Sequence, residues 1–284
     1  ESGKPVISNL NGDTGIYTEG DTPLAIDHGE NGTVSNPDSD FNGGKLTVSG
    51  ANSISEFTQI TPSINLALSN GMNSGSTITI GGTTIGSIAT GKTGRMGSDL
   101  VISFNANATD ELVGTLLHHI SYSNISEISL GTRSIYLTLQ NALALISDAT
   151  IVTISTSVAN DAPTLTTTAS NPTFLEGNST VSLFSNASAS TIESGQTFTS
   201  FELVVSNVFD AGSEQLFLDG SLISLTNGTT GTNSVNSLTY SVSVFGSTAT
   251  VTVSGGSLNT EDLQSLVNSL GYKNNSADLT EANR

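Results

Sequence analysis

Hydrophobic and polar residues alternate in many short runs along the chain, and glycine, asparagine and serine separate these runs. Residues 77–80 alternate in this way and are followed by Gly81 and Gly82, a pair that favours the two-residue turn of a β-hairpin. Residues 238–253 predict a second hairpin, because two alternating runs flank Gly246. Many short strands joined by such turns predict an all-β fold of the β-sandwich kind.

Two segments depart from this alternation. In residues 110–120 and again in residues 261–270, two acidic residues precede apolar residues that are spaced by three and four positions. This spacing predicts one short helix in each segment, with the acids in the first turn, where the helix dipole favours negative charge. We expect each helix to pack on a sandwich and to be followed by a strand that begins at Tyr122 or Tyr272.

Five segments of the first half of the chain recur in the same order in the second half. The clearest match pairs Tyr17-Thr-Glu19-Gly20 with Phe174-Leu-Glu176-Gly177. The other matches are Phe41 with Phe198, residues 46–49 with 203–206, 78–82 with 216–220, and 116–124 with 266–274. These matches predict two tandem copies of one domain, at residues 1–159 and 164–284. We place a linker at 160–163, where Pro163 would end a strand ladder.

The second copy is shorter than the first at its C-terminal end. When Arg133 is aligned with Arg284, residues 134–161 of the first copy have no counterpart, although 134–139 and 150–156 are strand-like. We therefore expect the second copy to lack its last strands and to expose an apolar groove and unpaired strand edges, which invite another strand. Three origins stay open: a natural chain that continues, strands supplied by a neighbouring chain, and trimming or proteolysis.

Composition excludes several classes of function. The chain has 7 Lys+Arg against 25 Asp+Glu, a net charge of −18, which argues against nucleic acid and anionic membranes as partners. No apolar run approaches the ~18 residues of a membrane span, so we expect no membrane insertion. The absence of Cys excludes disulfides, thiolate metal sites and Cys nucleophiles. Few lysines with many threonines, serines, asparagines and glycines are typical of an extracellular protein.

One segment matches a nucleotide-binding pattern. Residues 86–93 fit the P-loop pattern GxxxxGK[ST]. A P-loop requires a helix that begins at the lysine, so that its N–H groups face phosphate, but Gly94 and Gly97 follow Lys92 and disfavour a helix. We predict a glycine-rich hairpin loop that does not bind nucleotides.

The histidines offer little for catalysis. His118 and His119 are adjacent on the first predicted helix and therefore point about 100° apart. His28 lies in a predicted loop, and the second copy contains no histidine. We expect neither a catalytic triad nor a histidine metal site, and an enzyme has the least support.

The carboxylates are more informative. Asp38-Ser39-Asp40 places two hard oxygen ligands in one extended turn, which suits Ca²⁺, although a solvated turn is the alternative. The predicted linker adds Asn160 and Asp161 as further oxygen donors.

Three of these motifs together resemble a known class of repeat. The linker Asn160-Asp161-Ala162-Pro163, the Tyr17–Asp21 motif and the Asp38-x-Asp40 turn resemble the tandem cadherin-like, immunoglobulin-type repeats of very large secreted bacterial surface proteins, the RTX-type adhesins. The resemblance implies Greek-key sandwiches, with Ca²⁺ stiffening the junctions between repeats. It implies metal ligands at Glu19 and Glu176, at Asp38 and Asp40, and at a junction that collects Glu19, Asn160, Asp161 and Glu193. The second copy departs from the family, because only Glu193 lies near its counterpart of the Asp-x-Asp turn.

These observations favour a non-enzymatic function. We expect an extender segment of a bacterial cell-surface adhesin that Ca²⁺ stiffens, with neighbouring repeats or other copies of the protein as partners and any surface or glycan target elsewhere in the parent protein. One alternative is a subunit of a self-assembling extracellular filament or surface layer joined by strand donation. Another is a carbohydrate-binding module, which the absence of Trp weakens, because sugars stack on aromatic rings.

Overall fold

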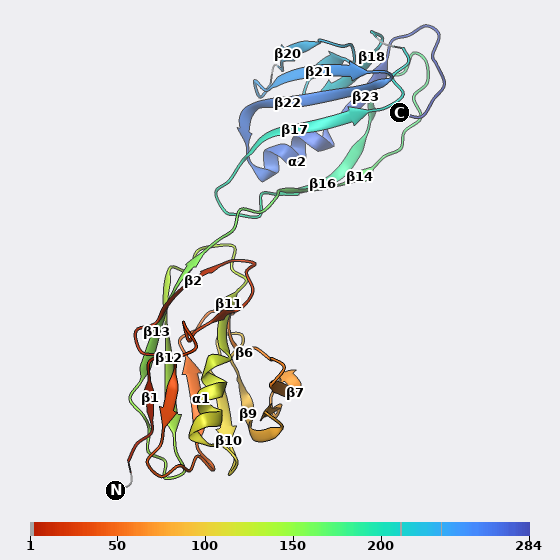
Figure 1. Ribbon diagram of the computed structural model, residues 1–284. Coiled ribbons are helices and arrows are strands. Elements are labelled where there is room, and N and C mark those ends of the chain that lie inside the picture. The colour runs from red at the N-terminus through yellow and green to blue at the C-terminus, as the bar shows by residue number, and fades with distance from the viewer. Residues whose placement is uncertain (1–2, 211, 234) are drawn as a thin grey trace. The chain divides into compact units, whose positions relative to one another are not determined.

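The computed structural model describes residues 3–210, 212–233 and 235–284. The chain divides into two compact units, Glu1–Ala159 (unit 1) and Asn160–Arg284 (unit 2). Each unit has its own buried hydrophobic cluster and is built mostly of antiparallel strands with one helix (Figure 1). Neither helix in the described ranges has the length and apolar character needed to cross a membrane. The prediction of a mostly β chain with one short helix in each half is confirmed, and the sandwich architecture stays a prediction.

The large sheet of unit 1 has eight strands, in the order β2-β13-β12-β5-β10-β9-β8-β7. Their bounds are Thr14–Thr18, Thr150–Ser157, Thr132–Gln140, Lys45–Ser49, Leu100–Phe104, Thr83–Thr93, Thr77–Ile80 and Leu66–Met72, in that order. β2 pairs with β13 in parallel, whereas the other neighbours are antiparallel. The inward apolar side chains of β12 and β13 are at most 1% exposed: Ile135, Leu137, Leu139, Val152 and Ile154. The hairpin of β12 and β13 is therefore part of the core of unit 1.

Residues 3–159 also form two smaller sheets and a helix. β1 (Val6–Ser8) pairs with β4 (Thr33–Ser35), and β11 (Ile120–Asn124) lies between β3 (Leu24–Ala25) and β6 (Glu56–Ile60). The helix α1 (Asp110–His118) begins after Thr109, whose side chain accepts a hydrogen bond from the Leu112 N–H at 3.2 Å. It buries Val113, Leu116 and Leu117, the apolar face that the sequence spacing predicts.

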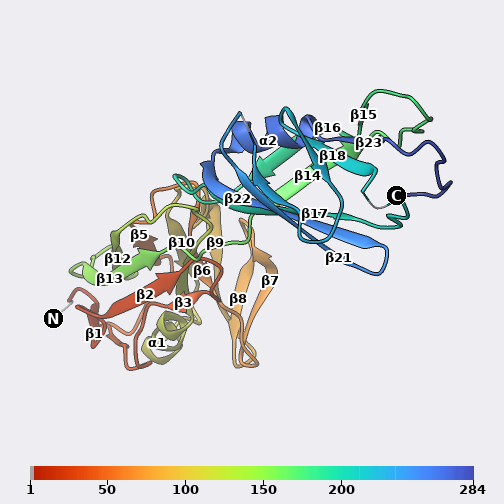
Figure 2. The ribbon, with the colours of Figure 1, turned by 90° about the horizontal axis from the view of Figure 1, so that it is seen from above.

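The described residues of unit 2 form three sheets and the helix α2 (Thr260–Asn268). The first has the order β17-β22-β21-β20, with bounds Phe198–Val205, Thr248–Leu258, Thr239–Phe245 and Thr230–Thr232. The second has the order β15-β23-β18-β19, with bounds Val181–Ser182, Gly271–Asn274, Glu214–Leu218 and Ser221–Ser224. The third pairs β14 (Thr164–Ala169) with β16 (Phe184–Ser190). β17, β22 and β21 run side by side in both views (Figure 1, Figure 2).

The sheets of the two units correspond in order. β5-β10-β9-β8 corresponds to β17-β22-β21-β20, and in each unit the helix joins the second of these strands to a strand that contains a buried tyrosine. One of the five sequence matches is wrong. Residues 78–82 form the hairpin of β8 and β9 in the large sheet, whereas 216–220 belong to β18 in the sheet that contains β23. The counterpart of β18 is β6, because both pair with the strand that follows the helix.

Candidate metal centre

Glu19 is placed by the end of β2. The strand ends at Thr18, and the Glu19 N–H donates to the Ser157 carbonyl oxygen at 3.0 Å, which ties the turn to the end of β13. The buried Tyr17 hydroxyl lies 3.1 Å from the Asp21 carbonyl oxygen, to which it donates. These contacts hold the Glu19 turn at the end of the large sheet from which the chain leaves unit 1.

A second carboxylate, Glu127, comes from the turn that follows β11. The Ser126 N–H donates to Oδ1 of the buried Asn124 at 3.1 Å, and the Ser126 hydroxyl donates to the Ile128 carbonyl oxygen at 2.9 Å. The backbone on both sides of Glu127 is therefore fixed, while its side chain is exposed. No sequence motif marked this residue as a candidate ligand.

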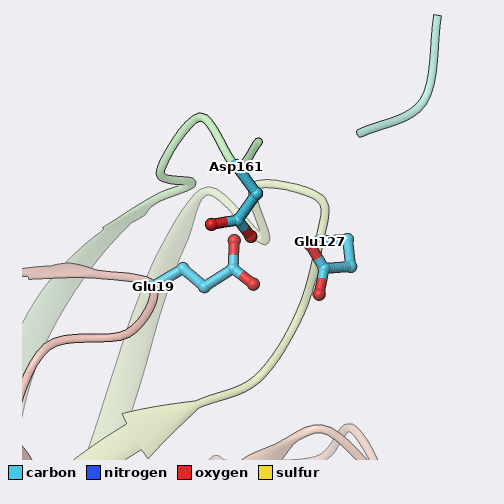
Figure 3. Close-up of side chains that lie close together, drawn as sticks. All are labelled: Glu19, Glu127 and Asp161. Atoms are coloured by element: carbon cyan, nitrogen blue, oxygen red, sulfur yellow. The ribbon is translucent and has the colours of Figure 1, made fainter. Parts of the chain in front are cut away.

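Glu19, Glu127 and Asp161 each bring a carboxylate oxygen within 4.8 Å of the others. Asp161 lies on the segment that follows β13 and is the second residue of unit 2. Figure 3 shows the three carboxylates directed toward one another from the β2 turn, the β11 turn and this segment. At neutral pH three carboxylates at this separation repel one another, and a bound cation would offset that repulsion. Their oxygens are the ligands that Ca²⁺ prefers.

The Glu193 side chain contacts the backbone of the segment that carries Asp161. The Glu193 side chain is 7% exposed, and its Oε1 accepts a short hydrogen bond from the Asp161 N–H. Its Oε2 is buried without a hydrogen-bond partner in the part of the chain that the structure describes. The predicted ligand Asn160 lies alongside, and its Oδ1 accepts from Gln196 Nε2 at 2.8 Å. An orphaned buried carboxylate oxygen is costly unless a cation or water satisfies it.

The other predicted ligands lie elsewhere. Asp40 forms a turn in which its Oδ1 accepts from the Asn42 N–H at 2.8 Å and its carbonyl oxygen accepts from Asn36 Nδ2 at 2.9 Å. Asp38 and Glu176 are exposed. Among the described residues, none of these three joins a group of three clustered carboxylate or histidine ligands. The Ca²⁺ ligands predicted at Asp38 and Asp40 therefore stay a prediction.

Two carboxylates that sequence analysis missed are fully buried. In unit 1, Glu56 is 0% exposed, and its Oε1 accepts from the Tyr122 hydroxyl and from Arg133 Nε, both at 2.8 Å. Its Oε2 accepts from the Ser53 N–H at 2.9 Å. Tyr122 also packs edge-to-face on Tyr17, with ring centroids 5.7 Å apart.

Unit 2 repeats this cluster around Glu214, which is also 0% exposed. Its Oε2 accepts from the Tyr272 hydroxyl and from Arg284 Nε, both at 2.7 Å. Its Oε1 accepts from Arg284 Nη2 at 3.0 Å and from the N–H groups of Phe209 and Asp210, both at 2.9 Å. Because both oxygens are occupied by partners within the unit, we interpret Glu214 as structural.

The clusters shift the pKa values of their members. Burial opposes ionisation of Glu214, but the hydrogen bonds from Arg284, Asp210 and Tyr272 outweigh it and lower the pKa of this carboxyl. Burial, followed by the hydrogen bond to Glu214, raises the pKa of Tyr272 to about 12. Burial and the contact with Glu56 raise the pKa of Tyr122 in the same way.

The nucleotide-like segment is a strand. The predicted glycine-rich hairpin loop is confined to residues 94–99, because β9 continues through Thr93, which pairs with Leu100 of β10; the predicted flanking strands at 85–88 and 100–104 lie in β9 and β10. Gly86 is required by packing, since a Cβ at this position would overlap the Ser103 carbonyl oxygen of β10. Lys92 forms an ion pair with Asp99, with Nζ 3.3 Å from Oδ2. No helix begins at Lys92, so the N–H groups that cradle phosphate in a P-loop are not assembled.

The histidine with the closest contacts is held by the fold. His118 ends α1, and its Nε2 lies 2.8 Å from the Gly32 carbonyl oxygen and 3.4 Å from Oδ2 of the buried Asp27. Asp27 also accepts from the N–H groups of Asn31 and Gly32. These contacts join the helix end to the loop that precedes β4.

Comparison of the chain with models of known protein families and with curated proteins gives no match.

Proposed function

We propose that the chain is an extender segment of an extracellular bacterial surface protein, built of two cadherin-like Greek-key repeats, in which Ca²⁺ binds at Asp161. The single observation that carries this proposal is the convergence of the carboxylates of Glu19, Glu127 and Asp161. Three carboxylates offer up to about six oxygens, and Ca²⁺ takes 6–8 in flexible geometry.

The position of Asp161 supports a mechanical role. The residue lies on the segment that follows β13 and is the second residue of unit 2, whereas Glu19 and Glu127 lie on turns of unit 1 that hydrogen bonds hold in place. A cation shared by the three would tether this segment to unit 1 and reduce its freedom. The buried Glu193 fixes the Asp161 backbone from unit 2, so restraint of Asp161 would also restrain the start of unit 2.

The amino-acid composition supports the proposed extracellular location of the chain. A chain with 7 Lys+Arg against 25 Asp+Glu suits an extracellular module that binds Ca²⁺ with a dissociation constant of about 10⁻⁴–10⁻³ M. The same acidity supports cation binding over binding to nucleic acid or anionic membranes.

Calorimetric titration of the full chain with CaCl₂ tests the proposal. We expect one binding event, weakened at least tenfold by Glu127→Gln, which removes one ligand charge from an exposed side chain. The matched control is Asp38→Asn, an exposed carboxylate outside the cluster, which should leave the affinity unchanged. The site would be rejected if the unmodified chain did not bind Ca²⁺, or if Glu127→Gln and Asp38→Asn lost Ca²⁺ affinity equally.

A further inference from the structure

Five asparagines of the chain directly precede a glycine. The pairs are Asn11-Gly12, Asn31-Gly32, Asn42-Gly43, Asn70-Gly71 and Asn227-Gly228. In such a pair the backbone nitrogen of the glycine can attack the side-chain carbonyl carbon of the asparagine, because glycine has no side chain to hinder the approach. All five asparagines are exposed, so exposure does not separate them. They differ in how hydrogen bonds hold the two reacting groups.

Four of the five pairs are held by hydrogen bonds from the glycine N–H. The acceptors, in chain order of these pairs, are the Ile151 carbonyl oxygen at 2.8 Å, Asp27 Oδ2 at 3.0 Å, the Phe104 carbonyl oxygen at 3.1 Å and the Val242 carbonyl oxygen at 3.0 Å. Two of the asparagine side chains are held as well. Asn11 Oδ1 accepts from the Ile151 N–H at 2.9 Å, and Asn227 Oδ1 accepts from the Val244 N–H at 2.9 Å. Groups held in this way react only when their segment opens locally.

The pair Asn70-Gly71 lies in β7, the last strand in the order of the large sheet. The residue pairs that join β7 to β8 end at Leu68, so Asn70 and Gly71 extend past the paired stretch. Asn70 is held by its backbone: its N–H donates to Ser76 Oγ at 3.0 Å, and its carbonyl oxygen accepts from Asn73 Nδ2 at 2.9 Å. Within the described ranges no hydrogen bond holds its side-chain amide.

The space around Gly71 is also open. Its φ is 53°, and a Cβ added there would meet no atom of a non-neighbouring described residue within 4 Å. Solvent base and water therefore have access to the glycine nitrogen and to the exposed side chain of Asn70. The attack is intramolecular, so no catalyst is needed to bring the two groups together.

We propose that Asn70 is a site of spontaneous deamidation. Base removes the proton of the Gly71 N–H, and the nitrogen attacks Asn70 Cγ and forms a new C–N bond. The C–N bond of the side-chain amide then breaks, and its nitrogen takes a proton from solvent and leaves as ammonia, so that a cyclic imide remains. Water opens the imide at Cγ to give aspartate, or at the backbone carbonyl carbon to give isoaspartate. The net reaction consumes one water and releases one ammonia.

The isoaspartate product should loosen β7 locally. It places the Asn70 side-chain methylene in the main chain, which lengthens the backbone by one atom before Gly71. On one side of this insertion the Asn70 N–H is bonded to Ser76, and on the other side Met72 is 8% exposed, with its Sδ accepting from the Ile60 N–H at 3.3 Å. Both products also place a negative charge in a strand whose residues 66–72 carry none.

Ageing of the full chain in mildly alkaline buffer tests the proposal. Samples are digested with pepsin in acid, which stops the reaction, and mass spectrometry measures conversion to aspartate and isoaspartate at each of the five asparagines. In the folded chain we expect Asn70 to convert at least tenfold faster than each of the other four. In denaturant, where the hydrogen bonds are lost, the five rates should converge. The control Asn70→Gln adds a methylene, so the same ring cannot close, and it should remove the fast conversion.

Three results would overturn the assignment. The first is an Asn70 that is stable in the folded chain and reacts only in denaturant, and the second is equally fast conversion at any of the four held pairs. The third is aspartate as the sole product, which would mean direct hydrolysis without attack by Gly71. Hydrogen exchange of the aged chain should be faster at residues 69–76 than in the fresh chain, and the same acceleration in aged Asn70→Gln would contradict the local effect.

Discussion

In each unit, removal of one hydrogen bond to the buried carboxylate should lower the stability of that unit and leave the other unit unchanged. The perturbation is Tyr272→Phe, which removes the hydroxyl that donates to Glu214 Oε2 at 2.7 Å and leaves the ring and its contact with Phe174 in place. Phenylalanine fills the same volume, so no cavity term is added. A hydrogen bond to a charged, buried acceptor contributes about 1.5–3 kcal/mol.

This magnitude is measurable in unit 2, which spans Asn160–Arg284. For a domain of this size the loss corresponds to a fall in melting temperature of roughly 5–12 °C. Amides that exchange through unfolding of unit 2 should exchange roughly 10- to 150-fold faster, since 1.36 kcal/mol is a factor of ten. Hydrogen-exchange mass spectrometry separates β18 and β23 from β6 and β11, so each unit reports on its own cluster.

The repeat provides matched controls. Tyr122→Phe should reverse the pattern, because its hydroxyl donates to Glu56 in unit 1 at 2.8 Å. Tyr136→Phe removes the hydroxyl of a side chain that is 41% exposed and should change neither unit. A change below threefold in unit 2, or an equal change in both units on Tyr272→Phe, would refute the reasoning.

Two further predictions concern pH and nucleotides. The pKa values of Glu214 and Asp210 are lowered in the folded state, so these carboxylates contribute fully to stability above their ordinary pKa values of 4.5 and 3.8, and the contribution is lost as pH falls through the lowered values. The pKa of Tyr272 is raised from 10.0 to about 12, so its contribution is complete below pH 10.0 and is lost as pH rises through about 12. Chemical denaturation of unit 2 from pH 2 to 12 should show both losses, and a stability that is flat below pH 4 would contradict the first. Because Lys92 lies in β9 beside Asp99, ATP and GTP should not bind, and a micromolar affinity that Lys92→Ala abolishes would contradict this assignment.

Sequence patterns predicted the elements whose signal is local. The spacing of apolar residues placed α1 and α2 within two residues of their observed ends, because an amphipathic helix carries its full pattern in one segment. The hairpin turn at Gly81 and Gly82 is equally local and is observed between β8 and β9.

Features that depend on pairing between distant segments were not predictable in the same way. Gly91 suggested that the hairpin loop begins before Lys92, but β9 continues to Thr93, because Thr93 pairs with Leu100 of β10, a pairing that only the sheet reveals. The same limit applies to Glu56 and Glu214. The sequence showed that their partners Tyr122 and Tyr272 align, but each glutamate is distant in sequence from its tyrosine and lies in no motif.

The candidate metal site illustrates both cases. The linker motif marked Asp161 and the Tyr17–Asp21 motif marked Glu19, and the structure brings their carboxylates together. Glu127 joins them only because β11 ends beside β2, and this contact between distant segments left no trace in its local sequence.

The most direct test of the account is thermal unfolding of the full chain in Ca²⁺ and in chelator, compared with Asp161→Asn. If Ca²⁺ binds at Asp161, the metal should raise the melting temperature of the unmodified chain, with a stabilisation of about 2.7 kcal/mol at one hundred times the dissociation constant. Asp161→Asn removes the carboxylate shared with Glu19 and Glu127 and should abolish most of this response. Identical melting curves in Ca²⁺ and chelator, or the same rise in Asp161→Asn, would contradict the claim that calcium acts at this segment.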